Sequence, residues 1–143
     1  MKHVKRLSVM LLAGLSLYLT AFGLLYGTRL ELMPHHDAAT PDDVTEQILP
    51  LYRTLMRLTG AAATALGIIS LYIVLGPLRA GVKGAALVVC LCLTGFFAAT
   101  ALAAAQLQAV SGATTHWPVM AGLAALTVFA FGLHRFAVSC EAP

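Results

Sequence analysis

Four long runs of apolar residues, separated by short polar segments, constrain this chain more than any other feature. The runs cover residues 7–27, 51–78, 85–107 and 117–133. A bilayer core is about 30 Å thick and is crossed by about 20 helical residues. Because hydrocarbon offers no partner to backbone polar groups, a single run that crosses it must be helical. The pattern predicts an all-α membrane protein with four transmembrane helices.

Composition supports this prediction and excludes other classes of protein. Of 143 residues, 59% are hydrophobic and 10% are charged, whereas soluble domains have about a quarter charged. Four spans leave no room for a soluble catalytic domain, so residues 1–143 are expected to form one domain. The net charge of +3 comes without a basic patch interleaved with aromatic residues, so nucleic acid is not an expected partner.

The basic residues divide unevenly between the two ends of the predicted spans. One side is expected to carry Lys2, Lys5, Arg6, Arg79, Lys83 and Arg135, and the other Arg29, Arg53 and Arg57. The positive-inside rule then places both termini in the cytoplasm. We expect an antiparallel up-down bundle that crosses a bacterial inner membrane several times, with the bilayer as its first partner.

The segment 28–50 is the largest loop and is expected on the outer side. Thr40-Pro41-Asp42-Asp43 is typical of a helix start, with Thr40 as the N-cap and two acids near the positive end of the dipole. A short interfacial helix is therefore predicted in this loop. Pro50 lacks an amide hydrogen, and we expect a break or kink there before the second span.

Two arginines and a tryptophan form the first candidate site. Arg53 and Arg57 are four residues apart and share one face of a helix. They suit the headgroup of a lipid or a quinone, with Trp117 stacking nearby. The alternative is that the arginines extend to lipid phosphates or pair with acids of the outer loop.

Histidines form the second candidate site. Side chains of this type bind a transition metal or move protons. The candidates are His35, His36 and His116, with Asp37, and the predicted topology brings them to one side of the membrane. With Arg57, they also allow an enzymatic site. However, the chain has no His-x-x-x-His or Cys-x-x-Cys spacing, so these residues are equally explained as plain loop histidines. No histidine is expected inside a span, so haem is not predicted, and a metal ion is the only cofactor considered.

Small residues recur four apart in the second and third spans. The pairs are Gly60 and Thr64, Ala63 and Gly67, Gly95 and Ala99, and Ala101 and Ala105. Such spacing lets helices approach closely, so these residues are expected to pack helices within the bundle or against a partner.

Several short motifs add a resemblance. They are Met33-Pro34-His35-His36, Leu51-Tyr52-Arg53-Thr54-Leu55-Met56-Arg57, Leu75-Gly76-Pro77-Leu78-Arg79 and Ser111-Gly112-Ala113-Thr114-Thr115-His116-Trp117-Pro118. With them, residues 7–133 resemble a group of small bacterial four-helix membrane proteins, which carry a Met-Pro-Tyr-His motif after the first span and a Gly-x-x-Thr-Pro-Trp turn before the fourth. This chain departs from that pattern at His36 and His116. The resemblance implies the topology and supplies no activity.

Together these observations favour a non-enzymatic role without deciding it. The first hypothesis is an accessory or interaction subunit whose helices pack against a membrane partner or another copy. In the second span the uninterrupted apolar stretch begins after Arg57, at Leu58, and no Asp, Glu, Lys or Arg lies within the four apolar stretches so bounded. Two alternatives remain. One is a metal-handling or enzymatic site at the outer face, and the other is a binder of lipid or quinone headgroups.

Overall fold

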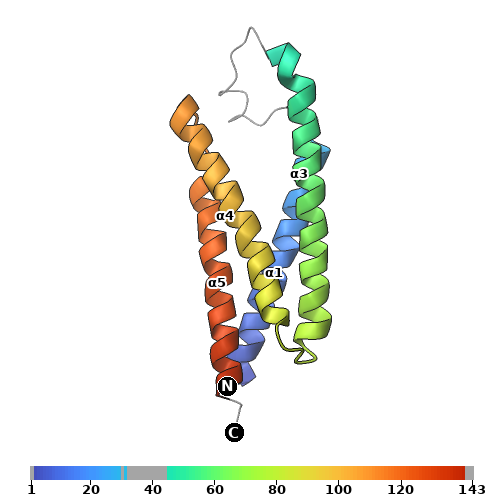
Figure 1. The fold of residues 1–143 in the computed structure, drawn as a ribbon, viewed down its shortest axis with the longest axis vertical. Helices are drawn as coiled ribbons and strands as arrows, with labels where there is room; N and C mark the ends of the chain where they lie inside the picture. The colour runs from blue at the N-terminus through green and yellow to red at the C-terminus, as the bar shows by residue number, and fades with distance from the viewer. Residues whose placement is uncertain (1, 30, 32–44, 141–143) are drawn as a thin grey trace.

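The computed structural model describes residues 2–29, 31 and 45–140 (Figure 1). Its elements are α1 (Lys2–Thr28), α3 (Thr45–Ile73), the π-helical η1 (Val74–Leu78), α4 (Ala85–Ser111) and α5 (Trp117–Ser139). Four segments of 27, 31, 27 and 23 residues are long and apolar enough to cross a membrane. Even 23 residues rise about 35 Å as a helix, more than a bilayer core of about 30 Å. The predictions of an all-helical fold and a small polytopic membrane protein are confirmed.

The helices are arranged as two pairs. α1 packs chiefly against α3, and α4 chiefly against α5, while α1 also contacts α5 and joins the pairs. Figure 1 shows the two pairs close together near the chain termini and farther apart at the opposite end. We call these the terminal end and the loop end.

The closest packing lies between α1 and α3, where glycines from both helices meet. A Cβ added to Gly60 would lie 2.5 Å from the Cα of Gly27, and one added to Gly23 would lie 2.6 Å from the carbonyl oxygen of Gly60. A Cβ at Gly67 would lie 2.6 Å from the backbone nitrogen of Thr20. No side chain larger than hydrogen fits at these positions without a shift, so glycine allows the two backbones to approach.

Large apolar side chains fill the centre of the bundle. Leu12 and Leu19 of α1 and Leu93 and Phe97 of α4 are fully buried. Ser16 is buried in this core, and its hydroxyl donates to the Leu12 carbonyl of the same helix at 2.8 Å. The hydrogen-bonding capacity of this hydroxyl is therefore used locally.

Two prolines lie within helical segments. The predicted break at Pro50 is wrong, because α3 runs through this residue. Pro50 is exposed and close to the start of the helix, where the missing amide removes one hydrogen bond and the following turns are unaffected. Pro77 lies within η1, and the wider π-helical turn accommodates its ring near the helix end. The predicted N-cap segment Thr40–Asp43 lies outside the described residues.

The last helix is longer than predicted. α5 continues beyond Leu133 through His134 and Arg135 to Ser139. The reason is packing: His134 is buried, and its Nδ1 lies 3.2 Å from the Ser8 Oγ of α1. The expectation that no histidine lies inside a span is therefore wrong for His134, because a partner on another helix stabilises this polar ring within α5.

The glycine contact leads to a matched pair of substitutions. Gly60→Ala places a methyl group against Gly27, whereas Gly95→Ala meets nothing within 4 Å. We expect Gly60→Ala to destabilise the protein by about 1–3 kcal/mol through overpacking. Gly95→Ala should leave stability unchanged or raise it by up to about 1 kcal/mol through helix propensity. Thermal unfolding of both variants in one detergent measures this, and equal midpoints would contradict the close α1–α3 contact.

Candidate ligand site between the helix pairs

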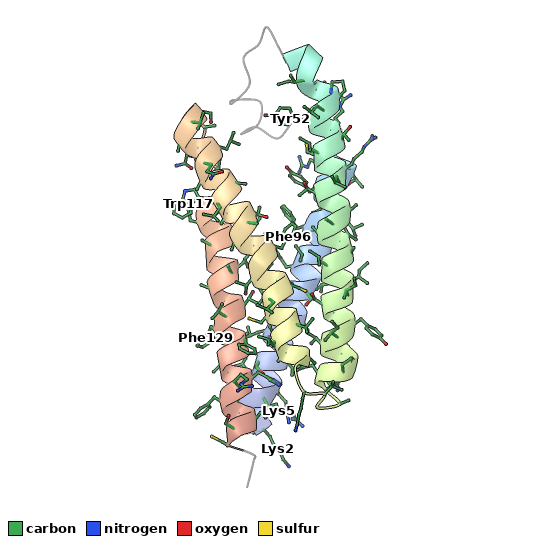
Figure 2. The ribbon with its side chains drawn as sticks, in the orientation of Figure 1. Lys2, Lys5, Tyr52, Phe96, Trp117 and Phe129 are labelled. Carbon is green, nitrogen blue, oxygen red and sulfur yellow. The ribbon has the colours of Figure 1, made fainter. Side chains whose placement is uncertain are left out.

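The structure separates the residues predicted to form a headgroup site. Arg53 and Arg57 are exposed on α3. Trp117, at the start of α5, is 38% exposed, and Figure 2 shows it on the side of α5 away from α3. α3 and α5 make no substantial direct contact, so Trp117 does not join the arginines.

Of the histidines proposed to bind metal, only His116 lies in the described part of the chain, and its side chain is exposed. His35, His36 and Asp37 lie outside it. Among the described residues, no group of three His, Cys, Asp or Glu side chains is placed to hold a metal ion. Cys90 is buried and Cys92 is partly buried in α4, both as free thiols.

A cavity of about 480 Å³ lies between the helix pairs near the loop end. Three helices supply most of its walls, and the turn before α5 closes it. Its lining consists of Tyr18, Phe22, Tyr26, Thr59, Thr100, Ala103, Ala104, Leu107, Thr115, His116, Val119 and Met120. We call it the loop-end cavity.

One wall of this cavity is a column of aromatic rings on α1. Tyr18 and Phe22 stack with ring centroids 6.4 Å apart, and Phe22 and Tyr26 stack at 5.4 Å. From α4, Phe96 meets the Phe22 ring edge-on at 6.4 Å, and Phe97 meets Tyr18 at 6.2 Å. Such contacts favour a fixed ring geometry, so the wall is aromatic and is held in place from α4.

Hydrogen bonds fix the turn that closes the cavity. The backbone N–H of Thr115 donates to Gln108 Oε1 at 3.2 Å, and the Thr115 hydroxyl lies 3.1 Å from the same oxygen and 3.0 Å from the Ala104 carbonyl oxygen. Gly112, with φ of 72°, ends α4 in a left-handed conformation that suits glycine. These contacts place Thr115 and His116 at the polar side of an otherwise apolar cavity.

Two further cavities open at the terminal end. One, of about 470 Å³, is lined in part by Lys5, Lys83, His134 and Arg135. The other, of about 930 Å³, is lined in part by Lys2, Lys5, Arg6 and Arg79. Together they contain all six basic residues assigned from the sequence to one side, so these residues gather at the same end of the molecule.

Sequence reasoning missed the three cavities. The column of Tyr18, Phe22 and Tyr26 has a visible signal, since the residues are four apart and share one face of a helix. The cavity lined by Lys5, Lys83 and His134 has none, because its residues come from segments far apart in the chain.

No protein-family model, curated protein or solved structure matches this chain. The class of ligand therefore follows from the residues that line each cavity. Of the residues that the structure describes, those that line the loop-end cavity include hydroxyl groups and one imidazole but no carboxylate, lysine or arginine. This composition suits binding of an uncharged molecule through apolar contact and a few hydrogen bonds.

The turn offers a test of this geometry. Thr115→Val keeps the side-chain shape and removes the hydroxyl that meets Gln108 and Ala104, so we expect a loss of about 1 kcal/mol of stability and faster amide exchange around residue 115. Thr114→Val is the matched control, because Thr114 is exposed. Hydrogen exchange and thermal unfolding measure both effects, and equal behaviour of the two variants would contradict the assigned hydrogen bonds.

Proposed function

We propose that this protein binds a lipid-soluble molecule with a flat, ring-shaped polar headgroup, of the quinone class, in the loop-end cavity. The observation that carries the proposal is the column of Tyr18, Phe22 and Tyr26 along one wall. A ring-shaped headgroup packs favourably against aromatic side chains, either edge to face or in an offset arrangement. This moves the predicted headgroup site from Arg53, Arg57 and Trp117 to the space between the helix pairs.

The size and polarity of the cavity support this ligand class. Its volume of about 480 Å³ lies in the range of about 300–1,000 Å³ typical of small-molecule sites. His116 lies at one side, where its imidazole N–H can donate to a ring oxygen, and Val119, 53% exposed, lines the apolar side. An isoprenoid or acyl tail would leave past such apolar residues into the bilayer.

The proposed orientation follows from charge. With six basic residues lining the terminal-end cavities, the positive-inside rule favours that end in the cytoplasm of a bacterial inner membrane. The loop-end cavity then opens within the outer leaflet, where a lipid-soluble molecule diffuses.

The test fills the loop-end cavity with a larger side chain. Ala104→Phe adds a ring to the lining, whereas Ala125→Phe adds one to an exposed position of α5 that does not line it. Native mass spectrometry of the purified protein with a short-tailed 1,4-benzoquinone should show a one-to-one complex. We expect Ala104→Phe to weaken it at least tenfold, a loss of about 1.4 kcal/mol or more, and Ala125→Phe to change it less than twofold. No complex, or equal weakening in both variants, would contradict the proposal.

A second candidate function is the accessory or interaction subunit expected from the small-residue faces. Gly60 and Gly67 meet α1 inside the protein, and Ala101 is buried. By contrast, Gly95 has no neighbour within 4 Å, and Ala99 is exposed. This face of α4 supports packing against a second copy or another membrane helix, because close approach there needs no rearrangement.

The second candidate predicts that larger residues on this face prevent association. Gly95→Leu with Ala99→Leu should shift chemically cross-linked protein in native membranes from larger species to the monomer. Ala61→Leu with Ala62→Leu, at exposed positions of α3, is the control and should leave cross-linking unchanged. Monomer alone in the unaltered protein would rule out this candidate and leave the quinone proposal standing.

A further inference from the structure

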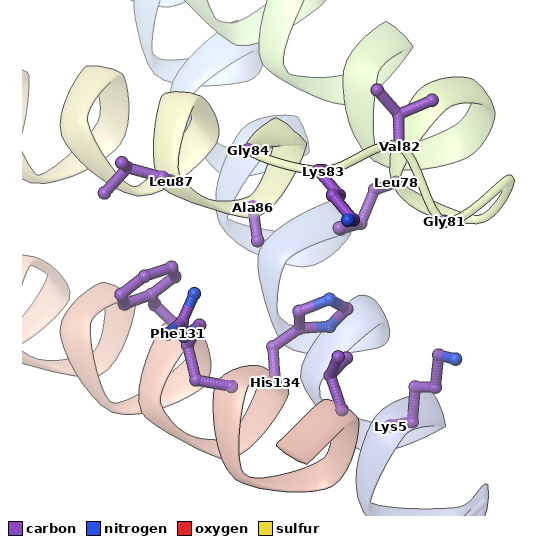
Figure 3. Close-up of a pocket in the computed structure, with 12 residues that line it drawn as sticks. Lys5, Leu78, Gly81, Val82, Lys83, Gly84, Ala86, Leu87, Phe131 and His134 are labelled. Atoms are coloured by element: carbon purple, nitrogen blue, oxygen red, sulfur yellow. The ribbon is translucent and has the colours of Figure 1, made fainter. Parts of the chain in front are cut away.

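The smaller terminal-end cavity, which we call the basic cavity, is lined by basic side chains and a histidine from three separate segments. Lys5 comes from α1, Lys83 from the turn after η1, and His134 and Arg135 from α5. Figure 3 shows Lys5, Lys83 and His134 directed toward a common space from these segments. Positive charge is therefore concentrated at the point where α1, α4 and α5 meet.

A hydrogen-bonded connection fixes the side of this cavity. The Ser8 hydroxyl donates to the Lys5 carbonyl at 2.8 Å, and Ser8 Oγ lies 3.2 Å from His134 Nδ1. Both Ser8 and His134 are buried. This contact joins α1 to α5 beside the cavity and sets the separation of the helix turns that carry Lys5 and Arg135.

The charge of this end is of one sign within the described residues. Lys2, Arg6 and Arg79 line the neighbouring cavity, which shares Lys5 and Leu78 with the basic cavity. Among the described side chains, that of Glu31 is acidic, and it belongs to the loop end. Cations clustered in a cleft attract an anion, and each contributes more to the local electrostatic potential than an isolated surface charge does.

The remaining walls of the basic cavity are apolar. Leu87 of α4 is 47% exposed and Val138 of α5 is 44% exposed, and both line the cavity with Phe131. In a bilayer Leu87 and Phe131 face hydrocarbon, because they lie deeper along α4 and α5 than the cations Lys83 and Arg135 at the headgroup level. Val138 lies beyond Arg135, toward the end of α5. The cavity is therefore suited to a molecule that is anionic at one end and apolar at the other.

We infer that the basic cavity is a specific site for one anionic phospholipid. The phosphodiester lies between Lys5, Lys83 and Arg135, and an acyl chain lies along Leu87 and Phe131. Basic pockets between transmembrane helices on the cytoplasmic side are chemically suited to such headgroups. A free phosphate would use the cations alone and would leave the apolar walls without a partner.

The experiment compares two double variants that remove equal charge from the same end. Lys83→Gln with Arg135→Gln alters the basic cavity, and Arg6→Gln with Arg79→Gln alters the neighbouring one. The full chain, stripped of lipid in mild detergent, is titrated with phosphatidylglycerol and, separately, with phosphatidylethanolamine, and bound lipid is counted by native mass spectrometry. Gel filtration checks that each variant remains folded, and Lys83→Arg with Arg135→Lys serves as the conservative variant.

We expect the unaltered protein to bind one phosphatidylglycerol in preference to phosphatidylethanolamine. The first double variant should bind it about 20-fold more weakly, which corresponds to roughly fivefold for each removed charge. The control should bind within about threefold of the unaltered protein, and the conservative variant should retain binding. Equal weakening in the two double variants, or equal binding of both lipids, would overturn the inference in favour of diffuse attraction.

Inorganic phosphate distinguishes the source of the anion. Phosphate added at millimolar concentration should neither raise the unfolding temperature nor displace phosphatidylglycerol at equal concentration. If phosphate alone binds as tightly as the lipid does, the site belongs to a soluble anion and the lipid assignment is wrong. If the first double variant unfolds in detergent, the single variant Lys83→Gln, on the exposed turn, gives the same comparison against Arg79→Gln.

Discussion

The close approach of α1 and α3 is the contact on which the rest of the arrangement depends. Lipid tails are as apolar as leucine, so burial from water does not hold two membrane helices together, and close packing must do so. Gly60 of α3 lies against Gly23 and Gly27 of α1, and neither Gly60 nor Gly23 has room for a Cβ. Tyr18, Phe22 and Tyr26 lie on a different face of α1, since Phe22 and Tyr26 each precede one of these glycines by one residue, about 100° around the helix. One side of α1 thus admits a helix closely, and the other meets α4 through large rings.

The difference between these two faces of α1 explains why the two ends of the molecule form cavities of different chemistry. At the terminal end, the Ser8 and His134 contact brings α1 against α5, and cations gather around the junction. At the loop end, aromatic rings separate the helix pairs and leave a largely apolar cavity. One site is therefore suited to an anion with a lipid tail, and the other to an uncharged ring. The two proposed ligands differ because the packing at the two ends differs.

Parts of the fold followed from local patterns, and others did not. Apolar length predicted the four helices, and Gly84 and Gly112, both at positive φ, lie in segments expected to be turns. The extent of α5 was missed because His134 looked like the end of an apolar run, whereas a buried partner stabilises it. Pro50 was expected to interrupt a helix, but near a helix start proline removes one bond and the rest of the helix forms. Local sequence rules therefore misplaced an element where a contact from another helix, or the position within the helix, changed the cost of a residue.

By itself, the sequence determined the number of helices, the membrane as their solvent and the division of basic residues, because each depends on run length or on position along the chain. Only the tertiary structure decided that Gly60 and Gly67 are covered while Gly95 and Ala99 are not. It also decided that Trp117 does not join Arg53 and Arg57, and that Lys5, Lys83 and Arg135 line one cavity. The physical reason is that helical spacing specifies which residues share a face of one helix, whereas the packing of several helices selects which faces meet.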